Sequence, residues 1–69
     1  MTLKKRSFSL SGHRTSVALE AEFWEIVTAE AARLGLSLAA YVSRIDAARG
    51  PRPLASALRL AALEAARTG

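Results

Sequence analysis

A short alternating segment, from His13 to Leu19, carries the side chains best suited to binding chemistry. Successive side chains of a strand point in opposite directions, so the segment has two distinct surfaces. The surface that we expect to be exposed carries Arg14, Ser16 and Ala18. The surface that we expect to be buried carries Thr15, Val17 and Leu19. Because a guanidinium and a hydroxyl form hydrogen bonds, the exposed surface can bind a polar partner.

The net positive charge of the chain lies at its N-terminus. The first 14 residues contain no acidic side chain and four basic ones, which are Lys4, Lys5, Arg6 and Arg14. The other six basic residues are balanced by six acidic ones, so the whole formal net charge of +4 is N-terminal. A basic segment beside a neutral folded part indicates a polyanionic partner. The alternative is a tail that only improves solubility.

Size and composition limit the possible folds. The 69 residues allow one domain, and a chain of this size buries only about 60% of its unfolded surface. There is no cysteine and only one histidine, His13, which argues against disulfides and against a metal site. His13 itself is expected to flank a turn, to contact a partner or, least favoured, to bind a metal. We therefore expect a second copy to stabilise the chain, as a homodimer or as part of a tetramer.

The acidic residues do not form a catalytic group. Glu20, Glu22 and Glu25 fit the first turn of a helix, where carboxylates meet the positive end of the helix dipole. No nucleophile and base are paired near them, so we predict no enzyme, no catalytic residue and no cofactor. No apolar stretch follows the basic N-terminal residues, so we expect no signal peptide, and no apolar run reaches the ~18 residues that a membrane span needs. We expect a cytoplasmic protein with no membrane partner.

The strand at 13–19 must pair with another strand to be stable in water. Its partner is either residues 7–11, which alternate weakly and would form a hairpin about Gly12, or the same strand of a second chain. Residues 1–6 are predicted to be a mobile basic arm.

Three helices are predicted after the strand, at Ala21–Leu34, Leu38–Arg49 and Leu54–Arg67. Gly35 is placed to end the first helix in a left-handed conformation, and Ser37 is placed to cap the start of the second. The third helix is apolar on most sides, so the body of the domain or a partner must cover it.

Apolar side chains spaced three and four residues apart give the first two helices a buried face. Together with the buried surface of the strand, this face predicts the core of a dimer. The predicted core residues are Val17, Leu19, Phe23, Trp24, Ile26, Val27, Leu34, Leu38, Tyr41, Val42 and Ile45.

The pattern HRTSVALE-AEFWEIVTAEAARLG-LS-LAAYVSRI resembles the ribbon-helix-helix family of DNA-binding proteins. The most specific parts are Gly12 to Ser16, Glu22 to Trp24 and Gly35 to Leu38, and they are most similar to a small bacterial subgroup with a trailing third helix. The resemblance implies a mostly α-helical fold with one short β-strand per chain. Two copies would pair these strands in an intermolecular antiparallel ribbon above an intertwined helical core. Residues 1–12 would then be a basic arm, 13–50 the ribbon-helix-helix core, and 51–69 a proline-containing turn and the C-terminal helix.

The resemblance also implies that the ribbon lies in the major groove of double-stranded DNA. The residues that would face the bases are Arg14, Ser16 and Ala18. Arg14 is the strongest candidate, because its fork matches guanine O6 and N7, whereas Ala18 is shorter than the polar side chains usual in the family. The residues that would bind phosphate are Ser37 and Leu38 at a helix N-terminus, together with Lys4, Lys5 and Arg6.

These patterns support two functions. The leading hypothesis is a homodimeric, sequence-reading DNA-binding protein that regulates transcription. The alternative is a protein-interaction or assembly module, such as an antitoxin or an accessory subunit, that docks through the apolar helix at 54–67. Binding to duplex DNA distinguishes the first function, and a stable protein partner distinguishes the second.

Overall fold

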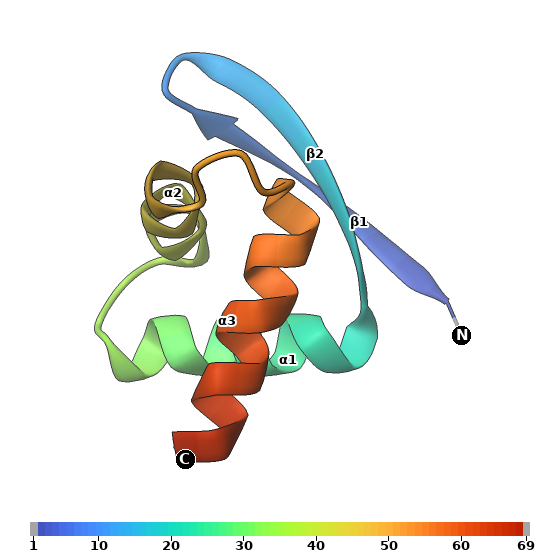
Figure 1. Ribbon diagram of the computed structural model, residues 1–69, viewed down its shortest axis with the longest axis vertical. Coiled ribbons are helices and arrows are strands. Elements are labelled where there is room, and N and C mark those ends of the chain that lie inside the picture. The colour runs from blue at the N-terminus through green and yellow to red at the C-terminus, as the bar shows by residue number, and fades with distance from the viewer. Residues whose placement is uncertain (1, 69) are drawn as a thin grey trace.

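The computed structural model describes residues 2–68 and consists of a two-stranded antiparallel sheet followed by three helices (Figure 1). The strands are β1 (Leu3–Leu10) and β2 (His13–Glu20). The helices are α1 (Ala21–Arg33), α2 (Leu38–Ala48) and α3 (Leu54–Thr68). The prediction of a mostly helical fold with an antiparallel ribbon and a third helix is confirmed. Each helix begins at the predicted residue and ends within one residue of the predicted end.

The two strands form a tight hairpin within one chain. Ser11 and Gly12 connect them, and both have positive φ angles, 51° and 80°, as a two-residue type I′ turn requires. The register pairs Leu10 with His13 beside the turn and runs to the open end of the hairpin, eight residues along each strand. Of the two partners that the sequence allowed for β2, the structure contains the hairpin partner.

This hairpin corrects two predictions. Residues 3–6 are not a mobile arm, because they form the first half of β1. The chain also contains two strands, where one short strand per chain was predicted; the predicted pairing between two chains stays a prediction. A two-residue loop closes at little entropic cost, and Phe8 and Leu10 give β1 a buried surface that continues the buried surface of β2. The ribbon can therefore form without a second chain.

Local signals fix the ends of α1 and α2. Gly35 has a φ of 72° and follows the last turn of α1. The amides of Gly35 and Leu36 donate to the carbonyls of Ala32 and Ala31, at 3.0 and 2.9 Å, which is the Schellman arrangement. At the start of α2 the Ser37 hydroxyl accepts a hydrogen bond from the amide of Ala40 at 3.1 Å. Both predicted caps are confirmed.

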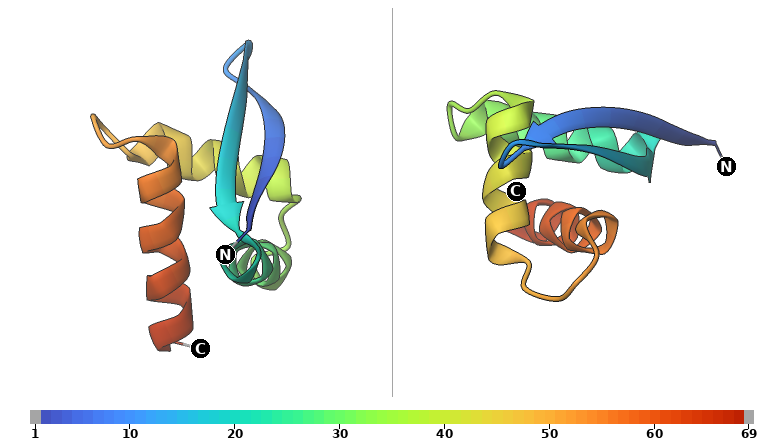
Figure 2. Two further views of the ribbon diagram at one scale, coloured as in Figure 1. Left: turned by 90° about the vertical axis from the view of Figure 1, so that its right-hand side faces the viewer. Right: turned by 90° about the horizontal axis from the view of Figure 1, so that it is seen from above.

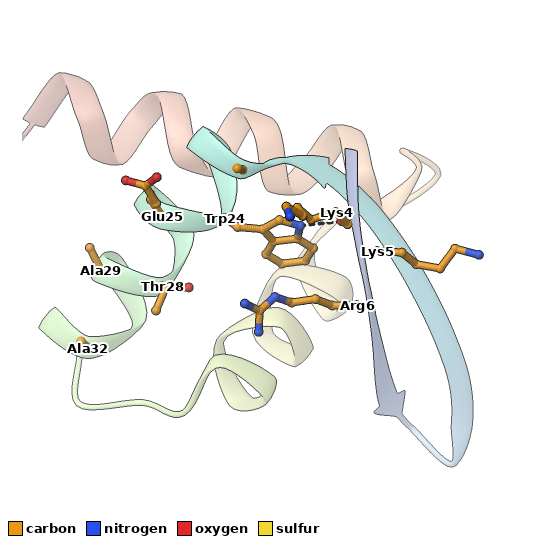
Figure 3. A pocket seen from close by; sticks show the side chains of 9 residues that line it. Lys4, Lys5, Arg6, Trp24, Glu25, Thr28, Ala29 and Ala32 are labelled. Atoms are coloured by element: carbon orange, nitrogen blue, oxygen red, sulfur yellow. Dashed lines mark hydrogen bonds between the residues drawn. The ribbon is translucent and has the colours of Figure 1, made fainter. Parts of the chain in front are cut away.

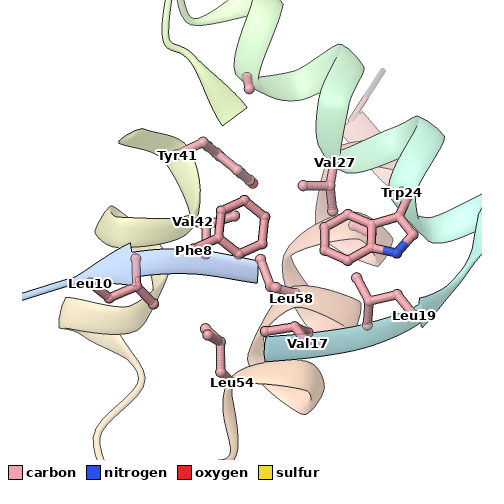
Figure 4. Packing of buried hydrophobic residues seen from close by; sticks show 12 residues of the cluster. Phe8, Leu10, Val17, Leu19, Trp24, Val27, Tyr41, Val42, Leu54 and Leu58 are labelled. Carbon is pink, nitrogen blue, oxygen red and sulfur yellow. The ribbon is translucent and has the colours of Figure 1, made fainter. Parts of the chain in front are cut away.

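One hydrophobic core joins the hairpin and the three helices (Figure 4). Seen from above, the hairpin reaches from α2, at its turn, to the start of α1, at its open end (Figure 2). Six of the predicted dimer-core residues are buried within the single chain: Val17, Leu19, Trp24, Val27, Tyr41 and Val42. Four more are partly buried against them: Phe23, Ile26, Leu38 and Ile45. The chain thus buries with its own elements most of the surface that was assigned to a partner.

The buried stripe of α1 differs in detail from the predicted one. Trp24, Val27 and Ala31 are its most buried residues, whereas Phe23 is half-buried. Leu34 was predicted to be in the core but has 41% of its surface exposed. The reason is that α1 turns its Trp24 side toward β1, and Leu34 lies at the C-cap, where the chain already leaves the core.

The third helix folds back on its own chain, where it contacts α1, α2 and β2. Its buried residues are Leu54, Ala57, Leu58 and Ala62. Arg59 ties it to the junction of β2 and α1, because its Nε lies 3.2 Å from Glu20 Oε1 and its guanidinium lies 5.9 Å from the Phe23 ring centroid. Leu60 and Leu63 remain 45% and 51% exposed. No helix in the described part of the chain is long and apolar enough to cross a membrane.

Candidate nucleic-acid interface

The hairpin presents one polar face to solvent, and both strands contribute to it. Directly paired residues of an antiparallel ribbon point to the same side. On this side the pair of Leu3 with Glu20 lies at the open end, and three pairs follow toward the turn: Lys5 with Ala18, Ser7 with Ser16, and Ser9 with Arg14. We call the six residues of these three pairs the outward face. All are exposed except Ala18, which is half-buried.

The outward face contains every residue that the sequence predicted to face bases, and three residues that it did not. Arg14, Ser16 and Ala18 lie on one side of β2, while Val17 and Leu19 are buried on the other, as expected from the alternation. The three residues that were not predicted, Lys5, Ser7 and Ser9, lie on β1. Their position follows from the same alternation if residues 3–10 form a hairpin with β2 about Gly12. The sequence left that pairing open.

The cations of the outward face are available to a ligand. Within residues 2–68, neither Arg14 nor Lys5 makes a side-chain hydrogen bond or an ion pair. Between them, the hydroxyls of Ser7 and Ser16 lie 3.0 Å apart and bond to each other. The centre of the outward face therefore consists of two short side chains that hydrogen-bond to each other, and its charged side chains lie at the two ends.

The predicted phosphate-binding cations of β1 do not act together. Lys5 belongs to the outward face, whereas Lys4 and Arg6 point toward α1 (Figure 3). The Lys4 carbonyl accepts a hydrogen bond from Trp24 Nε1 at 2.7 Å. The Arg6 guanidinium lies over the Trp24 ring, 5.5 Å from its centroid. Trp24 therefore anchors the open end of the hairpin to α1 and holds Arg6 beside it.

An open groove of about 790 Å³ runs between β1 and α1. Lys4 and Arg6 line one wall, and Trp24 lies beside them. Glu25, Thr28 and small alanines of α1 form the opposite wall. We call this space the β1–α1 groove. No local pattern indicated this groove, because its two walls are separated in the chain by the whole of β2.

The start of α2 is a second polar feature. Ser37 is exposed, and its hydroxyl already accepts the Ala40 amide. Within the described residues no group accepts the amides of Leu38 and Ala39, which are the first two of the helix. Unpaired amides and the helix dipole give this end a partial positive charge. α2 lies beneath the turn end of the hairpin and contacts β1 (Figure 1).

None of the acidic residues belongs to the six-residue outward face, although Glu20 follows Ala18 on the same side of the ribbon, opposite Leu3. The Glu20 carboxylate bonds to its own backbone amide and to Arg59, and these hydrogen bonds lower the pKa of Glu20 below its ordinary value. Glu30 bonds to Arg33 at 2.7 Å, which lowers the pKa of the Glu30 carboxyl. His13 is exposed beside the turn. Among residues 2–68, no three histidine, cysteine or acidic side chains are grouped to hold a metal ion.

A family model described as a ribbon-helix-helix domain matches residues 3–66 of the chain. The match extends from the start of β1 into the last turns of α3, so it includes both strands and all three helices. No curated protein sequence and no solved structure matches the chain.

Proposed function

Because this chain belongs to the ribbon-helix-helix family, whose members are generally DNA-binding transcription regulators, we propose that it regulates transcription by placing its hairpin in the major groove of DNA. The observation that carries this proposal is the outward face, which is polar, exposed and cationic at both ends. The major groove is about 12 Å wide and admits a two-stranded ribbon. A ribbon of this width is present in each copy of the chain.

Arg14 is the principal base reader in this proposal. Its free guanidinium can donate two parallel hydrogen bonds to guanine O6 and N7, a contact that is worth about 1–3 kcal/mol of discrimination. Ser16, with Ser7 and Ser9 from β1, can donate to or accept from base edges at shorter reach. Ala18 can contact only a thymine methyl group. We therefore expect the protein to read few bases and to gain most of its affinity from phosphates.

Phosphate contacts would come from two places. The free amides of Leu38 and of the residue after it, next to Ser37, can bind a phosphate at the start of α2. Lys5 lies on the outward face, and Lys4 and Arg6 lie along the same strand, so cations flank the ribbon. Such contacts fix register without reading sequence. They also make binding strongly dependent on salt concentration.

We propose further that two copies act as a homodimer, each supplying one hairpin to one half-site, in the cytoplasm of a bacterial cell. Ribbon-helix-helix proteins typically bind DNA as dimers. The dimer would use surface that one chain leaves uncovered, such as Leu60 and Leu63 on α3. The ribbon itself needs no partner strand, so we expect base reading and dimerisation to be separable.

A fluorescence anisotropy titration with genomic duplex fragments tests this function. We expect binding at ~50 mM salt that weakens steeply as salt rises, because phosphate contacts release counterions. Arg14→Ala should reduce affinity for the best fragment by about 1–3 kcal/mol. Arg14→Lys should keep the charge but lose most of the preference among fragments.

The matched control is Arg67→Ala, which removes the same charge from the far end of α3. Its ion pair with Glu64 is exposed and long, at 4.0 Å, so the change should alter neither folding nor DNA binding measurably. The proposal fails if the unmodified chain binds no duplex at ~50 mM salt, where electrostatic attraction is strongest.

A second candidate function is favoured by one observation. Leu60 and Leu63 give α3 an apolar surface that its own chain does not cover, which suits docking through residues 54–67 to another protein. If the chain is such an interaction module, it should form a stable complex with a partner protein and should bind no duplex at any salt concentration. Replacing both leucines by Ser should abolish that complex. Duplex binding that survives the double replacement supports the regulator.

A further inference from the structure

β1 is an edge strand with unpaired backbone groups. In a two-residue hairpin the pair beside the turn is hydrogen-bonded in both directions, and the bonded pairs then alternate along the ribbon. Counting from Leu10 and His13, the residues of β1 that direct their amide and carbonyl away from β2 are Leu3, Lys5, Ser7 and Ser9. No other segment of residues 2–68 pairs with this side of β1. Such a row is a template for another strand.

The β1–α1 groove lies beside this edge and determines which strand suits it. Lys4 and Arg6 are the two cations whose side chains point into the groove, and Lys5 lies between them at its edge with its side chain on the outward face. Trp24 and the alanines of α1 supply apolar surface, and Glu25 is the carboxylate on the α1 wall. An occupant is therefore attracted if it carries acidic side chains close to β1, and repelled if it carries them close to α1.

We propose that the free edge of β1 binds an extended acidic segment of a partner protein, which adds as a third antiparallel or parallel strand and seats alternate side chains in the β1–α1 groove. The backbone groups of β1 would give affinity, and the cations would select acidic sequences. A second copy of the chain does not fit this description. Its six carboxylates lie at the end of β2 or within helices, so residues 2–68 contain no extended acidic stretch.

A third strand would also exclude DNA. Strands lie about 4.8 Å apart, so a three-stranded sheet is wider than the ribbon that the major groove of about 12 Å admits. An acidic segment on β1 would therefore keep the hairpin out of DNA. This consequence rests on the proposed function, whereas the docking itself does not.

The docking is tested with the full chain and a blocked peptide of about eight residues, the length of a strand, in which Glu alternates with Thr. Trp24 is the single tryptophan of the chain and lines the groove, so its fluorescence reports binding. We expect a saturable change at ~50 mM salt and affinity at least about tenfold weaker for a peptide with Gln in place of Glu. Amide hydrogen exchange at Lys5, Ser7 and Ser9 should slow by about tenfold or more at saturation, because these amides become paired.

Two matched variants separate strand pairing from charge attraction. Ser7 and Ser16 face each other across the hairpin, and the amide of each points to a different edge. Ser7→Pro removes a donor from the β1 edge and should abolish peptide binding, whereas Ser16→Pro removes one from the β2 edge and should leave it intact. Proline is tolerated at such outward-facing edge positions. Glu25→Gln should tighten peptide binding, because it removes the carboxylate from the α1 wall.

The peptide and hydrogen-exchange measurements test the docking without any DNA present. No saturable fluorescence change, equal binding of the Gln peptide, or slowed exchange on β2 in place of β1 would overturn the proposal. If either proline variant fails to fold, the exchange measurement on the unmodified chain still decides. If duplex DNA, and not the peptide, protects the three β1 amides, the edge is a phosphate-contact surface and the proposal is overturned. Peptide binding without any duplex binding would leave the docking standing and remove the proposed function.

Discussion

The outward face has one cation at each end, and they come from different strands. Arg14 lies near the turn on β2, and Lys5 lies near the open end on β1. The hydroxyls between them are short, and those of Ser7 and Ser16 bond to each other. A face of this kind offers one bidentate base contact. Specificity should therefore depend mainly on Arg14, while α2 and the flanking cations position the ribbon.

Ser37 caps α2 and, in our proposal, lies next to a phosphate-binding site. Two substitutions distinguish these roles. Ser37→Ala removes the acceptor for the Ala40 amide and should lower the free energy of unfolding by about 1 kcal/mol. Ser37→Asp keeps an acceptor there, so stability should be retained. Its negative charge should nevertheless weaken DNA binding if a phosphate binds at this end.

Urea denaturation and duplex titration of the same samples measure both effects. Ser43→Ala is the control, because Ser43 is an exposed serine within α2. Ser37→Asp that binds DNA as tightly as the unmodified chain would remove the start of α2 from the interface.

Among the elements, the hairpin depends on a turn that few residues accept. Ser11 and Gly12 both have positive φ, and no atom lies within 4 Å of a Cβ added at Gly12. The cost of replacing Gly12 is therefore conformational and not steric. The turn needs two consecutive residues with positive φ, whereas the end of α1 needs one, Gly35.

Gly12→Ala should lower the free energy of unfolding by about 1–2 kcal/mol, because alanine rarely adopts a left-handed conformation. Gly12→Asn should cost less, since asparagine adopts this conformation more readily. Chemical denaturation of the three chains should give this order of stability. An alanine variant as stable as the unmodified chain would show that the turn differs from the one described.

The link between α3 and the β2–α1 junction gives a stability that depends on pH. The pKa of Glu20 is lowered in the folded chain, first by its own backbone amide and then by Arg59. Glu20 therefore stabilises the fold above its ordinary pKa of 4.5, and this contribution is lost as the pH falls through the lower, folded pKa. Glu20→Gln should lower the urea midpoint at neutral pH. The difference from the unmodified chain should shrink as the pH falls through the folded pKa of Glu20, because below it the carboxyl is protonated in both states.

The whole molecule has a core that one chain completes. Leu58 of α3 is fully buried against the other elements, whereas Leu63 is 51% exposed. The third helix is therefore part of the fold, and only its outer side is left for a partner. We therefore expect the chain to fold before it associates, unlike an intertwined dimer whose subunits share one core.

Leu58→Ala should lower the free energy of unfolding by about 2–5 kcal/mol, because it leaves a cavity in the core. Leu63→Ala should stay within about 0.5 kcal/mol. Sedimentation equilibrium adds a second measurement. If the exposed leucines form the dimer surface, Leu63→Ala should weaken dimerisation without unfolding the chain. Dimerisation that Leu60→Ala and Leu63→Ala both leave unchanged would place the dimer surface elsewhere.

Short-range patterns were enough to predict the helix bounds, the caps at Gly35 and Ser37, and the two surfaces of β2. Each depends on residues within one or two turns, whose periodicity and backbone preferences act whatever the distant chain does. The same holds for Arg14, Ser16 and Ala18, because a strand alternates wherever it pairs. Their contact with bases is a proposal that the family supports and that the titrations above test.

Short-range patterns could not predict which strand pairs with β2. Residues 3–10 and a second copy of β2 both have polar and apolar residues in an alternation that matches that of β2. Folding selects between them through loop closure and the fit of Phe8 and Leu10 to the core, which are properties of the assembled chain. The separation of Lys5 from Lys4 and Arg6, the burial of Trp24 in preference to Phe23, and the β1–α1 groove all follow from that pairing. Lys5 faces away from Lys4 and Arg6 because residues 3–10 form a strand, and the pairing with β2 is what makes them one.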